Sequence, residues 1–312
     1  MSKALHPVLC VVGPTAVGKS VVADEVAKRL GGEVVSVDSM QVYRGMDIGT
    51  AKSRPSERTC ALHMVDVANV DESYSVVRFQ RDARGCIDKL IAQGKPAVLC
   101  GGTGLYLDAV IDEMSFPHGE TGSSARSRYE ALAQREGPEA LHAMLVLRDP
   151  RSAQVIHPQN VRRVVRALEM LDEGVSYAKH HEGLKRRERH YDAHLWALAM
   201  PREQLYARID LRVDIMFEQG LVDEVAGLVA EGLTKDSTAG AAIGYKEVMR
   251  ALEGEITLDE ARSLVKRNSR RYAKRQLSWL RRDGRARWID MTDTAMDTAV
   301  QTICDDWRNI TT

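Results

Sequence analysis

The sequence predicts an α/β fold, a parallel β-sheet core flanked by helices and interrupted by an all-helical insertion. The first sign is residues 8–12, a continuous apolar and β-branched run typical of a strand covered on both faces. The second is the alternation of such runs with helical patterns that follows, which implies right-handed βαβ crossovers. The third is a polar, helical stretch that begins at Phe116 and contains no strand-like run before His194.

The elements of the sheet domain follow from their residue patterns. A helix that begins at Ser20 carries Val22 and Val26 at helical spacing and stops at Gly31, because glycine accepts the left-handed conformation that ends a helix. The strand that follows ends on Asp38. The predicted elements here are a strand at 8–12, a helix at 20–30, a strand at 33–37, a helix at 74–91 and a strand at 97–100.

Beyond Phe116 the pattern predicts a group of helices, a returning strand and two long helices. Proline and glycine breaks at residues 137–138 and 149–150 separate the first helices. The predicted elements are helices at 124–135, 138–147 and 160–171, a strand at 194–200, and helices at 202–229 and 258–280. We therefore expect a core domain of residues 1–115 and 194–312 and a helical insertion domain of residues 116–193.

The composition is that of an ordinary globular chain. Of the 312 residues, 44% are hydrophobic and 28% are charged, which argues against disorder, collagen and coiled coil. No run approaches the ~18 apolar residues of a membrane-spanning helix, and no cleavable signal pattern precedes the first strand. We therefore expect a cytoplasmic, monomeric protein without membrane association. The five cysteines have neither metal-site nor disulfide spacing and should be reduced.

Charge is unevenly distributed along a chain whose formal net charge is zero. Residues 262–287 contain eleven Lys or Arg side chains and a single acidic residue, Asp283. Such a stretch predicts a polyanionic partner. A solvated helical face balanced by acids elsewhere is the alternative, and composition alone does not decide between the two.

The segment GPTAVGKS after the first strand fits the GxxxxGK[ST] motif between a buried strand and a helix. Backbone N–H groups and the helix N-terminus would converge on phosphate oxygens, Lys19 would neutralise a phosphate, and Ser20 could bind Mg²⁺. The core is therefore expected to be P-loop NTPase-like, and its cradle would accept a diphosphate as well as ATP. The predicted phosphate-binding residues are Gly13, Thr15, Ala16, Val17, Gly18, Lys19 and Ser20.

Two polar residues follow later strands. Because the carboxyl ends of parallel strands share one edge of a sheet, Asp38 and Thr103 should both border the phosphate site. Asp38 would either hold Mg²⁺ through water or take a proton from a nucleophile, with a turn or helix cap as the structural alternative. Thr103 could hydrogen-bond a phosphate oxygen, or else belong to a tight turn that caps the helix at Leu105.

Arginines recur at one-turn spacing in two places. Arg162, Arg163 and Arg166 do so in the predicted insertion, and Arg208 and Arg212 in a later helix. One-turn arginines are often surface ladders, but two sets that accompany a phosphate loop point to an anionic ligand.

Taken together, these segments resemble the bacterial-type tRNA dimethylallyltransferases, also called tRNA isopentenylpyrophosphate transferases, of the IPP transferase family. The resemblance extends over nearly the whole chain. Seven blocks carry it, in the family's order and spacing: GPTAVGKS, DSMQVYRGMDIGTAK, GGTGLYL, DPRSAQVIHPQNVRRVVRALEM, LYARIDLRVDIMFEQGLVDEV, AIGYKEV and SRRYAKRQLSWLRRD.

The resemblance implies Mg²⁺-dependent transfer of a dimethylallyl group from dimethylallyl diphosphate to N6 of adenine 37, next to the tRNA anticodon. Pyrophosphate would be released and no ATP consumed. The resemblance assigns proton removal from the amine to Asp38 and contact with the bridging oxygen to Thr103. Arg212 matches a family arginine that would neutralise the departing diphosphate, and it joins the predicted diphosphate site.

The same resemblance implies that the insertion domain binds tRNA and that the target adenine is flipped into a channel between insertion and core. It assigns tRNA contacts to Asp38, Ser39, Met40, Gln41, Arg162, Arg163 and Arg166. Arg162 stands where many members have glutamine, which replaces a donor and acceptor by a donor alone. We add the hypothesis that Arg270 and Lys274 hold tRNA phosphates.

Three other functions are compatible with parts of the pattern. A nucleotide kinase shares the P-loop sheet and mobile arginines, but it has no need of the basic C-terminal stretch. An isopentenyltransferase that acts on free adenine nucleotides shares the donor and the loop but normally lacks the insertion. An RNA-binding protein without catalysis leaves the phosphate loop unexplained.

Overall fold

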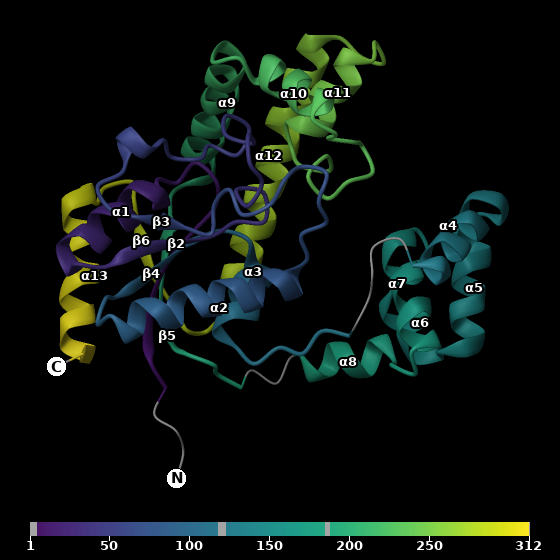
Figure 1. Ribbon diagram of the computed structural model, residues 1–312, viewed down its shortest axis with the longest axis horizontal. Coiled ribbons are helices and arrows are strands. Elements are labelled where there is room, and N and C mark those ends of the chain that lie inside the picture. Colours follow the sequence, from purple (N-terminus) through teal and green to yellow (C-terminus); the bar gives the residue numbers. More distant parts are fainter. Residues whose placement is uncertain (1–4, 118–122, 185–187, 312) are drawn as a thin grey trace. The chain divides into compact units, whose positions relative to one another are not determined.

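The structure, a computed structural model, describes residues 5–117, 123–184 and 188–311 (Figure 1). The chain divides into two compact units. The first comprises Met1–Asp112 and Arg189–Thr312 and contains the sheet, whereas the second, Glu113–Glu188, is helical in its described residues. The sequence placed the limits of the insertion at residues 116 and 193.

The sheet of the first unit is built from parallel strands: β1 (Pro7–Val12), β2 (Glu33–Val37), β3 (Leu62–His63), β4 (Ala97–Gly101), β5 (Asp192–Ala199) and β6 (Ala286–Asp290). Their order is β3-β2-β4-β1-β5-β6. β1 lies between β4 and β5, with Leu9 beside Val98 on one side and His194 on the other. β1, β2, β4 and β5 match the four predicted strands, so the predicted α/β fold is confirmed.

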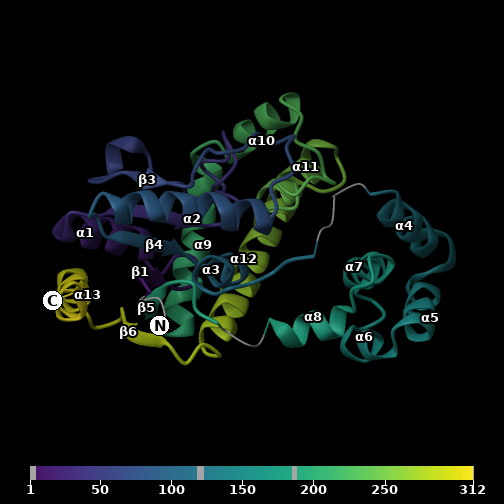
Figure 2. The same ribbon diagram turned by 60° about the horizontal axis from the view of Figure 1, so that its bottom comes forward.

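Helices cover both faces of this sheet. The helices of this unit are α1 (Lys19–Leu30), α2 (Val76–Ala92), α3 (Gly104–Ile111), α9 (Arg202–Glu218), α10 (Leu221–Ala230), α11 (Tyr245–Leu252), α12 (Leu258–Leu280) and α13 (Met296–Thr311), with a 3-10 helix, η1, at Pro55–Glu57. Alternate residues of β1 point to opposite faces, so Val8 and Cys10 enter one core and Leu9 and Val11 the other. The first core includes α2 and α3, and the second includes α1 and α13, which lie side by side in Figures 1 and 2.

The single long helix predicted over 202–229 is wrong. Two helices, α9 and α10, occupy this span, and Gly220 separates them with a φ of 98°. Glycine enters this left-handed region without the clash of a Cβ, so α9 ends and α10 begins in a new direction. α10 thereby reaches the loop after β2, where the Glu224 carboxylate accepts hydrogen bonds from the backbone N–H groups of residues 47–49.

The second unit contains α4 (Ser124–Glu136), α5 (Pro138–Arg148), α6 (Pro150–Val155), α7 (Val161–Asp172) and α8 (Tyr177–Gly183) in its described residues. α4, α5 and α7 confirm the three predicted helices to within one residue. They bury their own apolar core around Leu141, Leu145 and Leu168. α6 and α8 were not predicted. The break at residues 149–150 is the start of α6. Asp149 caps this helix, because its carboxylate accepts from the backbone N–H of Ser152 at 3.2 Å.

Two expectations drawn from composition can be compared with the structure. No helix among the described residues is both long and apolar enough to span a bilayer. All five cysteines are free thiols, as their spacing predicts: Cys10, Cys100 and Cys304 are buried, and Cys60 and Cys86 are partly buried.

Candidate active site

The phosphate loop connects β1 to α1 at the carboxyl edge of the sheet. Gly18, directly before α1, has a φ of 103°, a left-handed conformation that glycine tolerates. A side chain at Gly13 would place its Cβ 2.9 Å from the carbonyl oxygen of Leu198 on β5. The loop therefore lies tight against the neighbouring strand, and it runs from a buried strand into a helix as the motif predicts.

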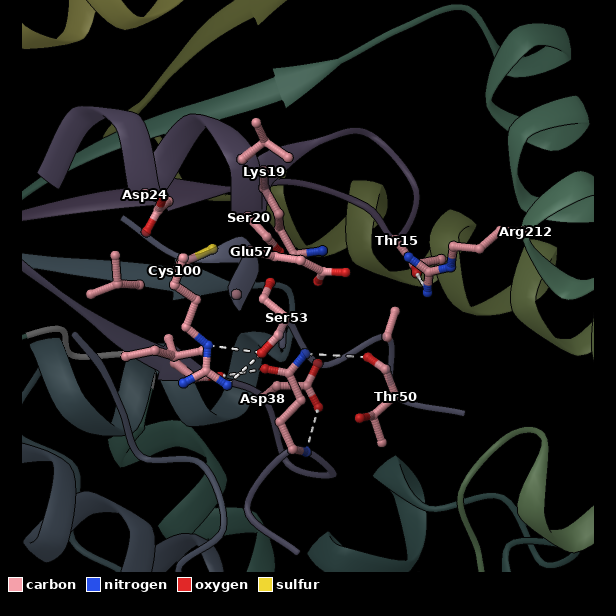
Figure 3. A pocket seen from close by; sticks show the side chains of 18 of the residues that line it. Thr15, Lys19, Ser20, Asp24, Asp38, Thr50, Ser53, Glu57, Cys100 and Arg212 are labelled. Carbon is pink, nitrogen blue, oxygen red and sulfur yellow. Dashed lines mark hydrogen bonds between the residues drawn. The ribbon is translucent and has the colours of Figure 1, made fainter. Parts of the chain in front are cut away.

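Two cations reach this loop. Lys19 lies half-buried at the start of α1, and its Nζ donates to the carbonyl oxygen of Pro14 at 3.4 Å. Arg212 extends from α9, and its Nη2 donates to Thr15 Oγ1 at 2.7 Å (Figure 3). Among the described residues, no carboxylate forms an ion pair with either cation. Burial lowers the pKa of both groups, and a bound anion would offset that unfavourable burial.

Asp38 follows β2 and lines the same space. Its Oδ1 accepts hydrogen bonds from the backbone N–H groups of Met40 at 2.9 Å and Gln41 at 3.4 Å, so the turn considered as a structural alternative is present. Oδ2 accepts no hydrogen bond within the part of the chain that the structure describes. The turn thus fixes one carboxylate oxygen and leaves the other to face a ligand.

Thr103 lies between β4 and α3, close to Asp38 in the neighbouring loop. Its Oγ1 accepts from the backbone N–H of Ser39 at 3.4 Å and lies 3.3 Å from the Tyr272 hydroxyl. Thr103 precedes α3 without capping it through its side chain, so the predicted capping alternative holds for the backbone position only. Burial and the charge of Asp38 raise the pKa of Tyr272 to about 12, which keeps this hydroxyl protonated.

Two adjoining cavities meet at these side chains. The first, about 300 Å³, extends past Lys19, Ser20 and Cys100, which Figure 3 shows around it. The second, about 290 Å³, is lined by aliphatic side chains that include Ile209 and Val213 of α9. The residues that line both cavities are Thr15, Asp38, Thr50, Arg212 and Tyr272. Asp38 and Arg212 therefore border the junction of a polar and a more apolar compartment, whereas Lys19 lines only the first cavity and Thr103 lines neither.

The three residues after Asp38 differ in how free their side chains are. Ser39 and Met40 line the second cavity. Gln41 lines the first, but its amide is held by the protein, since Oε1 accepts from Ser36 Oγ at 2.8 Å and Nε2 donates to the Thr50 carbonyl oxygen at 3.2 Å. This network shapes the wall between the β2 end and the loop that follows it.

The remaining predicted RNA contacts line neither of the two cavities. Arg162 and Arg163 are exposed on α7 of the helical unit, and Arg166 donates to the carbonyl oxygen of Pro117 at 3.0 Å. On α12, Arg270 is paired with Asp210 of α9. Lys274, one turn further along α12, is exposed and forms no ion pair with any described residue.

Sequence reasoning missed two residues of α12 that line the first cavity, Tyr272 and Gln276. Both lie in the block SRRYAKRQLSWLRRD, in which only the cations Arg270 and Lys274 were predicted to have a role. A usable signal was present, because Gln276 occupies the same helix face as Ala273 and Leu280, which are buried. A polar side chain in an otherwise apolar stripe requires hydrogen-bond partners, and here these come from two loops of the site.

A comparison with protein-family models matches this chain twice. The model described as IPP transferase matches residues 41–283, and the model described as isopentenyl transferase matches residues 6–63. The first match covers more than half of the chain.

Individual relatives are similar over most of their length. A tRNA dimethylallyltransferase of Streptomyces coelicolor is 47% identical over 283 residues, 90% of this chain and 89% of that protein. One from Exiguobacterium sp. is 44% identical over 301 residues, 96% of this chain and 95% of that protein.

Solved structures give the same picture. The crystal structure of the full-length tRNA isopentenylpyrophosphate transferase from Bacillus halodurans has a TM-score of 0.72 at 43% identity, over 97% of this chain and 96% of that one. A eukaryotic dimethylallyltransferase acting on tRNA has a TM-score of 0.80 at 27% identity, over 98% of this chain and 80% of that one.

Proposed function

The chain belongs to the IPP transferase family, and we propose that it transfers a dimethylallyl group from dimethylallyl diphosphate to N6 of adenine 37 of tRNA. The observation that carries the proposal is that Arg212 and Asp38 line both cavities, while Lys19 lines the first. The cations suit a diphosphate, and the carboxylate suits an amine that must lose a proton. Relatives named tRNA dimethylallyltransferase, 44% and 47% identical to this chain, support the choice of substrates.

The donor diphosphate binds in the first cavity. The N-terminus of α1 presents backbone N–H groups to its oxygens, and Lys19 and Arg212 neutralise its charge. The dimethylallyl group then lies at the junction, next to the aliphatic second cavity, which receives the flipped adenine.

The reaction is a displacement at C1 of the dimethylallyl group. N6 of the adenine forms the new C–N bond as the C1–O bond breaks, and pyrophosphate departs with the bonding electrons. Asp38 Oδ2 takes the proton that N6 loses, which matters because a neutral arylamine is a weak nucleophile. The Thr103 hydroxyl donates to the bridging oxygen, and Lys19 and Arg212 stabilise the charge that grows on the leaving group.

Mg²⁺ would be held by the Ser20 hydroxyl and, through water, by Asp38. Both line the first cavity, and both offer the hard oxygen atoms that Mg²⁺ prefers. This small number of protein ligands is enough for Mg²⁺, because the ion keeps several waters and binds phosphate oxygens of the substrate. When bound, it supplies further neutralisation of the diphosphate.

Ser20→Ala should therefore raise the Mg²⁺ concentration needed for half-maximal turnover by about 10-fold or more, with the RNA KM unchanged. A titration of activity against Mg²⁺ measures this, after a chelator has abolished turnover in both proteins. Identical Mg²⁺ curves for the variant and the unmodified protein would remove Ser20 from the metal site.

The basic face of α12 binds RNA phosphates. Lys274→Ala should raise the KM of the anticodon stem-loop and reduce the slope of log KM against log salt by about one, because one released counterion is lost. Arg270→Ala, four residues earlier on the same helix, should change the slope less, since Asp210 already neutralises that charge. If Lys274→Ala leaves both the KM and the salt slope unchanged, this side chain does not touch RNA.

The proposed function is tested by incubating the protein with labelled dimethylallyl diphosphate and an unmodified anticodon stem-loop, then mapping the labelled nucleotide. We expect label at adenine 37 and no need for ATP. Parallel reactions offer AMP as acceptor, or ATP with a panel of nucleotides. Preferential labelling of AMP would indicate a free-nucleotide isopentenyltransferase, and phosphorylation at the expense of ATP would indicate a kinase.

A further inference from the structure

Gln276 of α12 connects two loops of the site, the phosphate loop and the loop after β4. Its side chain extends from α12 and is 5% exposed. Oε1 accepts the backbone N–H of Thr15 in the phosphate loop at 2.8 Å, and Nε2 donates to the carbonyl oxygen of Gly102 after β4 at 3.0 Å. The loops that carry the phosphate site and Thr103 are therefore joined through one carboxamide.

Thr15 is held from two sides. Gln276 accepts a hydrogen bond from the backbone N–H of Thr15, and Arg212 donates one to the Thr15 hydroxyl at 2.7 Å. The backbone N–H of Thr15 thus donates to a side chain of the protein rather than to a phosphate oxygen. The position of the phosphate loop, and with it the place of Arg212, depends on where α12 holds Thr15.

α12 packs so closely against the loop after β4 that this loop has no space for side chains at Gly102 and Gly104. A Cβ at Gly102 would lie 2.1 Å from Gln276 Nε2, and a Cβ at Gly104 would lie 2.3 Å from the Trp279 ring. One turn before Gln276, the Tyr272 hydroxyl contacts Thr103 Oγ1. The glycines of this loop are therefore explained by the close approach of α12.

We propose that Gln276 is a positioning residue for the transfer reaction, which holds the phosphate loop and the Thr103 loop at a fixed separation. The inference rests on the proposed function. A diphosphate bound by the phosphate loop then lies at a set distance from Thr103 and Asp38. Only a side chain that accepts on one side and donates on the other can join an N–H to a carbonyl oxygen, so glutamine meets the requirement where glutamate ion or leucine does not.

Gln276→Glu tests this through pH. A protonated glutamic acid has nearly the shape of glutamine and keeps one acceptor and one O–H donor, whereas the ionised form faces the Gly102 carbonyl oxygen and adds negative charge beside the diphosphate. We expect kcat/KM for the donor, relative to the unmodified protein, to rise as pH falls from about 8 to about 6, because burial raises the pKa of such a carboxyl.

Other titratable and charged groups line the same cavity in both proteins, so their effects are common to the two pH profiles. They are Lys19 and Asp24 of α1, Asp38 after β2, Glu57 and Arg58 near η1, Cys100 of β4, Arg212 of α9 and Tyr272 of α12. Gln301→Glu, on the exposed face of α13, is the matched control and should follow the unmodified protein at every pH.

Gln276→Leu should lower kcat/KM for the donor about 10- to 100-fold at all pH values, since it leaves a buried N–H and a buried carbonyl oxygen unpaired. The RNA KM should not change. The affinity for pyrophosphate, measured by calorimetry, should fall in parallel. This measurement does not depend on transfer activity. An unmodified protein that binds pyrophosphate but never labels RNA contradicts the proposed function alone. An active unmodified protein with equally active Gln276 variants, or a Gln276→Glu loss that does not depend on pH, overturns the positioning role.

Discussion

Asp38→Asn is expected to lower kcat by ~100-fold or more while both substrates still bind, because the variant loses the group that removes the proton from N6. Asparagine Oδ1 can still accept from the Met40 N–H, so the turn after β2 is kept. The amide that replaces Oδ2 has no basic lone pair for the proton. Steady-state kinetics with the stem-loop and donor, varied separately, divide the effect between kcat and the two KM values.

Asp290→Asn provides a control with the same local structure. Asp290 also ends a strand, β6, and its Oδ1 accepts from the backbone N–H two residues later, at 2.9 Å. It lines neither cavity of the site, so its kcat should match that of the unmodified protein. A kcat for Asp38→Asn equal to that of the control would reduce Asp38 to a turn residue, and a rise in both KM values with kcat unchanged would make it a binding residue.

The interior of the sheet could be predicted from sequence because its strands are buried on both faces. Such strands are continuous apolar runs, as in β1 and β4. The two edge strands lack it. β3 has only two residues, and β6 exposes Arg287 and Trp288, so its sequence resembles the basic stretch before it.

The candidate site divides in the same way. The approach of the loop after β2 to Thr103, through the backbone N–H of Ser39, follows from the rule that parallel strands end at one edge, and the loop between β1 and α1 follows from its motif. The role of Asp38 stayed open because the sequence pattern of an aspartate after a strand is compatible both with a turn residue and with a general base. The structure shows the turn, with Oδ1 as its acceptor, and Oδ2 accepts no hydrogen bond from any described residue.

Contacts between segments that are far apart in the sequence could not be predicted. Gln276 meets Thr15 across 261 residues, and Arg270 meets Asp210 across 60. Helical periodicity tells which residues share a face, but not which other element that face meets. The basic character of α12 therefore predicted one role, the binding of RNA phosphates, for both Arg270 and Lys274. The structure separates a buried side chain that joins loops, Gln276, from an exposed cation, Lys274.

Lys19→Met should abolish most donor binding, with a loss of affinity of about 30-fold to several thousand-fold, the range measured when one partner of a buried charge pair is removed. Lys19 has no carboxylate partner among the described residues, so in the unliganded protein its charge is uncompensated at short range. The diphosphate provides that compensation. Calorimetry with dimethylallyl diphosphate or pyrophosphate measures the loss directly. Lys28→Met, on an exposed turn of the same helix, is the matched control.

The pH dependence of donor binding distinguishes a lost charge from a damaged loop. Burial lowers the pKa of Lys19, so the unmodified protein should lose donor affinity as pH rises, starting below the usual range of lysine. Lys19→Met should lack this alkaline loss. Three other groups still titrate at higher pH in the variant: Arg212, whose pKa burial also lowers, and the Cys100 thiol and the Tyr272 hydroxyl, with pKa values of about 11 and 12.

The stability of the unliganded variant completes the test. Because burial disfavours the charged form of Lys19 in the folded protein, methionine at this position removes an unfavourable charge, and the thermal midpoint should not fall. Weak donor binding with an unchanged midpoint would therefore assign the loss to the missing charge. Donor binding by Lys19→Met as tight as that of Lys28→Met would mean that the phosphate loop is not the donor site, and the reaction would have to be placed elsewhere in the molecule.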